Sequence, residues 1–171
     1  MPGDGRYDLR MSQLAAGPAA RAALSGRRDT DRMGRDWVPA LAQVPLFQGL
    51  SRRHLRRIAS LGKVRRFAPG SSIVRAGEAG SSFYVLLDGA ARVVAPRRRP
   101  QRLQAGDYFG EMALLDDSPR SAHVVAVDEV LTMTISRSAF GKLLKSEPAL
   151  ANALLRTLAA RLRAVEQSTA G

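Results

Sequence analysis

The residues best suited to binding chemistry lie between Phe109 and Ala122, where a glycine, an acid and an arginine share one short stretch. Gly110 lets the backbone approach another group closely, because no Cβ intervenes. The run Glu111–Leu115 can form one helical turn, whose first N–H groups have no intrahelical partner and attract an anion. A turn ending in proline then reverses the chain and brings Arg120 back over the same anion. The planar guanidinium of Arg120 is suited to bind two phosphate oxygens. This stretch, Phe109–Ala122, is named the cassette, and it predicts an anion-binding site.

Each charged residue of the cassette also has a purely structural explanation. Arg120 could pair with Asp116, Asp117 or Glu111, and the Glu111 carboxylate could stabilise the start of the short helix. Either explanation would suit an isolated arginine or glutamate. The two residues occur together, in one frame and with flanking glycines, and this combination favours ligand binding.

The sequence contains no catalytic or metal-binding pattern. No serine–histidine–aspartate arrangement and no glycine-rich nucleoside-triphosphate loop is present. The two histidines, His54 and His123, have no partner at metal-binding spacing, and there is no cysteine. We therefore predict a protein that is not an enzyme and has no metal site. We expect His54 to be exposed and His123 to be half-buried in a strand.

Composition favours a single soluble domain. The chain has 171 residues and is 45% apolar. No apolar run approaches the length of about eighteen residues that a membrane-spanning helix needs. The absence of cysteine and of a signal peptide favours a cytoplasmic location. The net charge of +12 is spread along the chain, which favours the approach of anions.

The first part of the chain divides near Asp36. Residues 1–36 show no sustained apolar period and predict a mobile N-terminal extension. Helical spacing begins at Trp37, and Ser51 can cap a further helix whose apolar stripe faces inward. Arginines and a lysine form a basic surface there, either a solvated face or a docking patch for nucleic acid or an anionic membrane. The stripe is Leu55, Ile58 and Leu61; the basic residues are Arg52, Arg53, Arg56, Arg57, Lys63, Arg65 and Arg66.

The middle of the chain, between Val64 and Ser136, reads as a series of short strands separated by glycine turns. This pattern is typical of an antiparallel sandwich, roll or jelly roll. An arginine-rich connection at Pro96–Pro100 is expected to be an exposed hairpin tip. The predicted strands are Val64–Phe67, Ser72–Arg75, Ser82–Asp88, Ala91–Ala95, Arg102–Gln104, Ala122–Val127 and Val130–Ser136.

Two helices are predicted at the C-terminal end. Ser136 is placed to cap the first, over Ala139–Lys145, and Pro148 suits the first position of the second, which runs to about Gln167. The second helix carries a seam that resembles a short coiled coil. Its residues either pair with a second copy of the chain or pack on the chain's own sheets. The seam is Leu155, Leu158, Leu162 and Val165.

The cassette closely resembles the phosphate-binding cassette of cyclic-nucleotide-binding domains. This family includes catabolite activators, regulatory subunits of cyclic-AMP-dependent kinase and cyclic-nucleotide-gated channels. The resemblance runs from about Val44 to Val165 and implies a mainly β fold with flanking α-helices. That fold is an eight-stranded antiparallel β-roll, jelly-roll-like, over about 63–136, with N-terminal helices, a short cassette helix and two C-terminal helices over about 137–167. The domain would span 37–171. The matching residues are Phe109, Gly110, Glu111, Met112, Ala113, Leu114, Leu115, Arg120, Ser121 and Ala122.

The resemblance also implies roles for individual residues. Arg120 would hold the cyclic phosphate, the backbone N–H groups of residues 112–114 would share its charge, and Ser121 would add a hydroxyl. Glu111 would accept the ribose 2′-hydroxyl proton. Three further residues follow from position alone: Val93 and Leu103 on the purine side, and Arg161 leaning from the last helix toward the cassette. The expected ligand-binding set is Gly110, Glu111, Met112, Ala113, Arg120, Ser121, Val93, Leu103 and Arg161.

The function implied is a non-enzymatic cyclic-nucleotide-binding signalling module. Cyclic AMP is the expected ligand, and cyclic GMP stays open because a hydroxyl at Ser121 occurs with both in the family. The module would signal by moving its C-terminal helix toward an unidentified protein partner, and that helix could also form a homodimer. We expect a stand-alone domain without a DNA-binding domain, because catabolite activators continue into a helix-turn-helix. The alternatives are a nucleotide-free β-roll adaptor and a basic nucleic-acid or membrane-surface binder.

Overall fold

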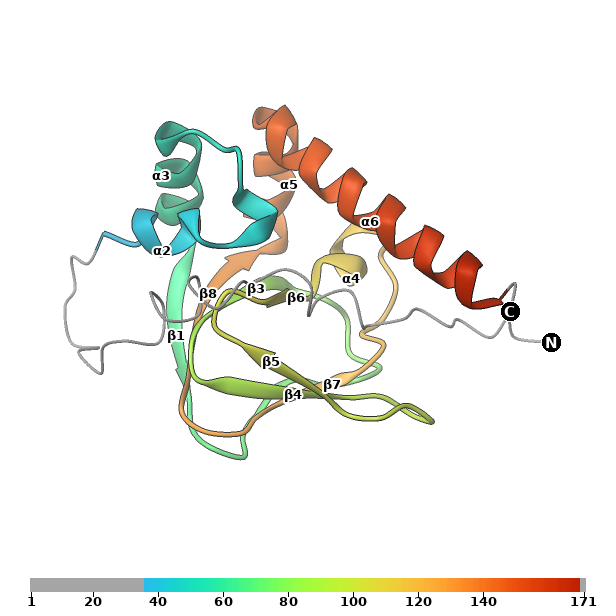
Figure 1. The fold of residues 1–171 in the computed structure, drawn as a ribbon. Coiled ribbons are helices and arrows are strands. Elements are labelled where there is room, and N and C mark those ends of the chain that lie inside the picture. The colour runs from blue at the N-terminus through green and yellow to red at the C-terminus, as the bar shows by residue number, and fades with distance from the viewer. Residues whose placement is uncertain (1–35, 170–171) are drawn as a thin grey trace.

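The computed structural model describes residues 36–169, so the predicted extension at 1–36 lies almost wholly outside the described residues. Within 36–169, eight strands form two four-stranded antiparallel sheets, accompanied by five α-helices and one 3₁₀ turn (Figure 1). The sheets form the lower part of the view and the helices cover the upper side. The predicted fold class, a mainly β roll with flanking helices, is confirmed.

The first sheet supports the helices. Its strand order is β1-β8-β3-β6, and β8 runs through its centre, buried along nearly its whole length. The apolar run of β8 suits this position because both of its faces are covered. Tyr84 of β3 lies opposite both Thr134 of β8 and Phe109 of β6, which brings the start of the cassette into this sheet. The strands are β1 (Lys63–Phe67), β3 (Ser82–Asp88), β6 (Tyr108–Phe109) and β8 (Val130–Ser136).

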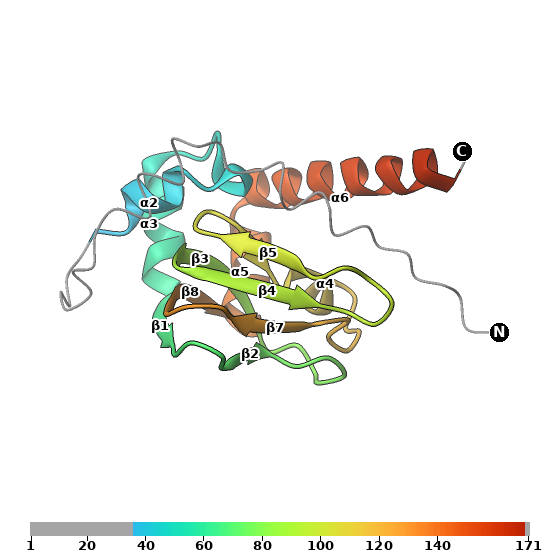
Figure 2. The same cartoon turned by 60° about the horizontal axis from the view of Figure 1, so that its bottom comes forward.

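The second sheet, seen face-on in Figure 2, has the order β2-β7-β4-β5. Side chains alternate across it with a period of two. Val93 of β4 and Leu103 of β5 are buried, whereas Arg92 and Arg102, which are directly opposite one another, are exposed. The predicted hairpin tip at 96–100 joins these two strands. The strands are β2 (Ser72–Val74), β4 (Ala90–Val94), β5 (Gln101–Gln104) and β7 (His123–Ala126).

The helices begin where their capping residues predict. The Ser51 side chain accepts a hydrogen bond from the backbone N–H of His54, and the Ser136 side chain accepts one from Ala139. Pro148 is the first residue of the long last helix. The elements are α2 (Val38–Ala42), a 3₁₀ turn (Pro45–Phe47), α3 (Arg52–Leu61), α4 (Glu111–Leu115), α5 (Arg137–Ser146) and α6 (Pro148–Thr169).

Two apolar clusters fill the domain. The larger lies between the first sheet and the helices and includes Leu55 and Ile58 of α3, as their spacing predicts, with Leu150 and Leu154 of α6. The smaller fills the roll on the inner side of the second sheet and includes Val93, Leu103 and Phe109. The cassette leaves β6 between these two clusters and passes into α4, beneath α6 in Figure 1.

Two expectations require correction, and one open alternative is narrowed. His54 is half-buried rather than exposed, because its side chain contacts Glu147. His123 is exposed rather than half-buried, since it projects from the outer face of the second sheet. Of the two alternatives for the seam, packing on the chain's own sheets does not hold for Leu155 and Leu162, which are 63% and 59% exposed.

Candidate functional site

Gly110 joins β6 to α4 in a conformation that only glycine adopts readily, with φ of +93°. A Cβ at this position would lie 2.7 Å from Nη1 of Arg120 and 2.9 Å from the carbonyl oxygen of Ser82. The glycine therefore allows the close backbone approach that its position predicts, and the group approached is the Arg120 guanidinium. The turn after α4 then returns the chain, with Asp117 at φ of +57°.

Arg120 is buried, with 7% of its surface exposed. Its Nη1 donates to the carbonyl oxygen of Gly110 at 2.7 Å, and its Nη2 donates to that of Ser82 at 2.5 Å. Its guanidinium also lies over the Tyr84 ring, 5.9 Å from the centroid. Within residues 36–169, no carboxylate lies within ion-pairing distance of it. The predicted alternative, a structural ion pair with a neighbouring acid, is therefore wrong.

The surroundings of Arg120 penalise its positive charge. Burial lowers the pKa of Arg120 below its ordinary value; Tyr84 and the Glu111 carboxylate partly offset this shift, and the positive charge of Arg137 adds to it. Carbonyl oxygens are neutral acceptors, so they satisfy the N–H groups without neutralising the ion. An anion reaching this guanidinium would form the stronger, charge-assisted type of hydrogen bond.

Glu111 is the first residue of α4 and is 4% exposed. Its Oε1 accepts a hydrogen bond from Nη1 of Arg161 on α6, at 2.5 Å. Arg161 also donates to the Tyr108 hydroxyl at 3.5 Å and lies 5.8 Å from the centroid of that ring. Burial by itself would lower the pKa of Arg161, but the Glu111 carboxylate and the Tyr108 hydroxyl raise it above its ordinary value. Arg161 thus stays charged and holds α6 against the cassette.

The apolar residues expected on the purine side line the interior of the roll. Val93 and Leu103 are 6% and 1% exposed and belong to the smaller cluster. The rings of Tyr84 and Phe109 stack at 4.8 Å with 7° between their planes, and Tyr84 packs against the same cluster. Since Arg120 lies over Tyr84, the cation and this apolar group are neighbours.

The remaining predicted site residues lie along the cassette at different depths. Met112 is half-buried and Ala113 is buried on α4. Ser121 is exposed at the end of the cassette, directly after Arg120. The structure thus brings Gly110, Glu111 and Arg161 together around α4, with Val93 and Leu103 deeper in the roll.

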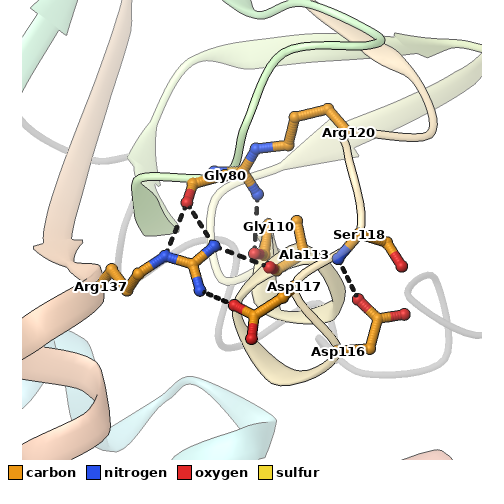
Figure 3. A network of polar contacts seen from close by, with 8 residues as sticks. All are labelled: Gly80, Gly110, Ala113, Asp116, Asp117, Ser118, Arg120 and Arg137. Atoms are coloured by element: carbon orange, nitrogen blue, oxygen red, sulfur yellow. Dashed lines mark hydrogen bonds and ion pairs between the residues drawn. The ribbon is translucent and has the colours of Figure 1, made fainter.

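Arg137 is a site residue that sequence reasoning missed. It is the first residue of α5, and its guanidinium binds the cassette and the carbonyl oxygen of Gly80 near the Arg120 guanidinium (Figure 3). It donates to the carbonyl oxygen of Gly80 from Nε at 3.0 Å and from Nη2 at 2.7 Å, and to that of Ala113 at 3.0 Å. Its Nη1 pairs with Asp117. No local pattern identifies this role, because an arginine after a capping serine is ordinary.

Part of the basic surface near α3 is paired. Arg57 lies 3.5 Å from a Glu147 oxygen, and Arg66 lies 2.7 Å from Glu129. No group of three acidic, histidine or cysteine side chains in residues 36–169 is placed to hold a metal ion. Across the same residues, no helix has the length and apolar character needed to cross a membrane.

Comparison with known proteins agrees with this geometry. Residues 64–147 match the family model described as the cyclic nucleotide-binding domain. This part of the chain, residues 64–147, belongs to the cyclic nucleotide-binding domain family.

Two kinds of relative stand out. The regulatory subunit of cAMP-dependent protein kinase from Hypocrea atroviridis is 36% identical over 104 residues, which make up 61% of this chain. The match covers 22% of that subunit, so the chain spans less than a quarter of its length. The Thermus thermophilus catabolite activator protein superposes with a TM-score of 0.67 at 30% identity, over 73% of this chain and 61% of that one. The regulatory domain of Toxoplasma gondii PKA, solved with cAMP, superposes with a TM-score of 0.63 at 30% identity, over 72% of this chain and 48% of that one.

Proposed function

We propose that this chain is a non-enzymatic signalling module that binds cyclic AMP and transmits the binding event through α6. The observation that carries the proposal is the state of Arg120. It is a buried cation at 7% exposure whose hydrogen-bond acceptors are two neutral carbonyl oxygens, and it lies inside a cassette of the matched family. A buried charge without a direct ion-pair partner is costly, and no carboxylate of residues 36–169 is within ion-pairing distance of Arg120, so a singly negative cyclic phosphate suits it.

The surrounding residues supply the other contacts of such a ligand. Arg120 would exchange its carbonyl acceptors for phosphate oxygens, with the N–H groups of residues 112–114 and the hydroxyl of Ser121 assisting. Glu111 would accept the ribose 2′-hydroxyl, and Val93 and Leu103 would bury the purine. The support for these roles is the burial of Glu111 beside the cassette glycine and the buried apolar cluster beneath Tyr84.

The signal would leave the site through Glu111. This carboxylate already holds Arg161 of α6, so a ribose hydroxyl that also binds Glu111 changes the contact that fixes the helix. A ligand shifts such an equilibrium only by binding one arrangement more tightly than the other, typically by about 1–3 kcal/mol. The second half of α6 would therefore move when nucleotide binds.

The partner that receives this signal would contact α6. Leu155 and Leu162 are largely exposed and lie seven residues apart, on one face of the helix. They offer an apolar surface to a protein partner or to a second copy of the chain. Light scattering with and without nucleotide distinguishes a homodimer from a monomer that awaits another protein. The proposal places the module in the cytoplasm, which the lack of cysteine favours.

Calorimetric titration of the full chain with a nucleotide panel tests the proposal. Cyclic AMP should bind with micromolar affinity, and cyclic GMP measures the selectivity for the base. The 2′-deoxy analogue of cyclic AMP should bind at least about tenfold more weakly, because it lacks the hydroxyl that Glu111 accepts. If the folded protein binds none of these cyclic nucleotides, the proposed function is wrong and an adaptor role replaces it.

A further inference from the structure

Two arginines hold three consecutive carbonyl groups in the connection that leads into β3. Arg137 binds the Gly80 oxygen with its side chain and the Ser81 oxygen with its own backbone N–H, at 2.8 Å. Arg120 binds the next oxygen, that of Ser82. The end of the connection and the first residue of β3 are therefore held by two arginines, one in the cassette and one at the start of α5.

Arg137 makes two further contacts, and both are to the cassette. It donates to the carbonyl oxygen of Ala113 in α4 and pairs with Asp117 in the turn after α4 (Figure 3). Ala113 lies near the C-terminal end of a short helix, where carbonyl groups lack intrahelical partners. One side chain thus joins the cassette helix, the cassette turn and the strand connection to the start of α5.

The geometry requires an arginine and close packing. Only a guanidinium offers a planar fork of five donors, so a lysine could not reach all of these acceptors at once. The fork can reach both carbonyls because the connection packs directly on α4. A Cβ at Gly80 would lie 2.6 Å from that of Ala113 and 3.3 Å from the Arg120 guanidinium carbon.

This arrangement matters for ligand capture. The two carbonyl acceptors that Arg120 uses belong to Gly110, which precedes α4, and to Ser82, two residues after Gly80. When an anion competes for Arg120, these contacts weaken while the contacts of Arg137 remain. A displacement of α4 is then passed to α5 through the Ala113 and Asp117 contacts.

We propose that Arg137 is a positioning residue that locks the cassette to the first turn of α5, so that phosphate capture by Arg120 reaches the C-terminal helices. The inference rests on the proposed function, because it needs a cyclic nucleotide to drive the movement. The side-chain donors of Arg137 bind Gly80, Ala113 and Asp117. The residue acts through the position of the cassette.

Two variants test the lock. Arg137→Gln removes the guanidinium group and its contacts with Gly80, Ala113 and Asp117. Asp117→Asn removes only the ion pair, on a side chain that is 83% exposed, and asparagine tolerates the left-handed conformation found there. Arg66→Gln is the matched control, because it breaks a comparable surface ion pair, between β1 and Glu129 in the connection from β7 to β8, that includes no cassette residue. Each full-length variant is titrated with cyclic AMP by calorimetry, and hydrogen exchange in α4, α5 and α6 is followed at saturating nucleotide.

The lock predicts a graded result. Arg137→Gln should weaken cyclic AMP binding about tenfold, within the range of typical coupling between sites. Asp117→Asn should weaken it about two- to threefold, as expected of one surface ion pair, and Arg66→Gln should leave it unchanged. At saturation, nucleotide should still protect α4 in Arg137→Gln while α5 no longer responds. A residue that merely stabilised the fold would lower protection everywhere, with or without nucleotide.

The opposing outcomes are distinct. If the wild-type chain binds cyclic AMP, and Arg137→Gln binds equally well with the same response in α5, the inference is overturned and the proposed function stands. If Arg137→Gln does not fold, Asp117→Asn decides: a reduced α5 response supports the lock, and a wild-type response overturns it. If the wild-type chain itself binds no cyclic nucleotide, the proposed function fails first and the lock loses its driving ligand.

Discussion

The two halves of α6 are attached to the domain by different means. At its start, Leu150 and Leu154 are 1% and 3% exposed in the larger apolar cluster. Glu147, the residue before the helix, lies 3.1 Å from the imidazole of His54 and 3.5 Å from the guanidinium of Arg57, both on α3. In the second half, the attachment is polar: Arg161 binds Glu111 and the Tyr108 hydroxyl.

The difference between the two halves of α6 indicates which part of the helix can respond to a ligand. Burying a leucine contributes about 1.5–3 kcal/mol, and nothing that binds the cassette can substitute for that contact. An ion pair differs, because another hydrogen-bonding group can compete for either partner. Glu147 and Glu111 are both buried acids that hold helices together, yet only Glu111 belongs to the cassette. The start of α6 is therefore a fixed anchor and its second half a responsive arm.

The anchor is broken most strongly by Leu150→Ala. Truncating a buried leucine typically costs about 2–5 kcal/mol of unfolding free energy, because it loses transfer energy and leaves a cavity. Leu162→Ala, on a side chain that is 59% exposed, is the matched control and should stay within about 0.5 kcal/mol. Urea unfolding measures both. Equal losses for the two variants would contradict the division of α6 into anchor and arm.

The two acids provide a finer comparison. Glu111→Gln should weaken cyclic AMP binding about tenfold or more, as expected for loss of a hydrogen bond to a charged group. It should also raise hydrogen exchange in residues 158–169, because Arg161 loses its ion pair. Glu147→Gln should destabilise the fold by about 1–3 kcal/mol and leave the affinity within about twofold, since its partners are on α3. If Glu147→Gln weakened cyclic AMP binding tenfold and Glu111→Gln left the affinity within twofold, the comparison would be refuted.

The sequence predicts most of this architecture, because its signals are local. Ser51, Ser136 and Pro148 mark helix starts by capping chemistry, and short segments bounded by turn residues mark every strand except β6. Tyr108 and Phe109, the two residues of β6, are too few to show a period. The cassette is recognisable because its residues are adjacent in sequence and carry a family pattern.

The contacts that organise the site are less predictable, because they join distant parts of the chain. Arg137 reaches Gly80 across 57 positions, and the pair of Arg161 with Glu111 spans 50. The position of Arg161 beside the cassette follows from the family resemblance, whereas no pattern marks Arg137. His54 shows the same difficulty, since its partner Glu147 lies at the junction of two helices far along the chain.

Substitution of Tyr108 should have the smallest effect on stability, and it tests only the attachment of the second half of α6. Burial raises the pKa of Tyr108 above its ordinary value of 10.0; the positive charge of Arg161 partly offsets this shift, and the negative charge of Glu111 adds to it. Because the folded-state pKa is the higher one, the contribution of Tyr108 to stability is complete below about pH 10 and is lost as the pH rises through the folded-state pKa. Tyr108→Phe should cost less than about 1 kcal/mol at neutral pH, since its bond to Arg161 is long.

Urea unfolding between pH 7 and 11 measures this difference. The wild-type chain should lose stability above pH 10 more steeply than Tyr108→Phe, because only the wild type must ionise a buried phenol. Parallel curves for the two proteins would show that the hydroxyl is not held in the folded arm as the structure has it.

The central claim is that the Arg120 guanidinium binds a cyclic phosphodiester, and calorimetric titration of wild type and Arg120→Ala with cyclic AMP tests it most directly. Removing one partner of a buried, hydrogen-bonded charge pair costs about 2–5 kcal/mol, which is roughly thirty- to several-thousand-fold in affinity. We predict micromolar binding by the wild-type chain and none at that level by Arg120→Ala, with both proteins folded by circular dichroism. Equal affinity of the two proteins would contradict the account.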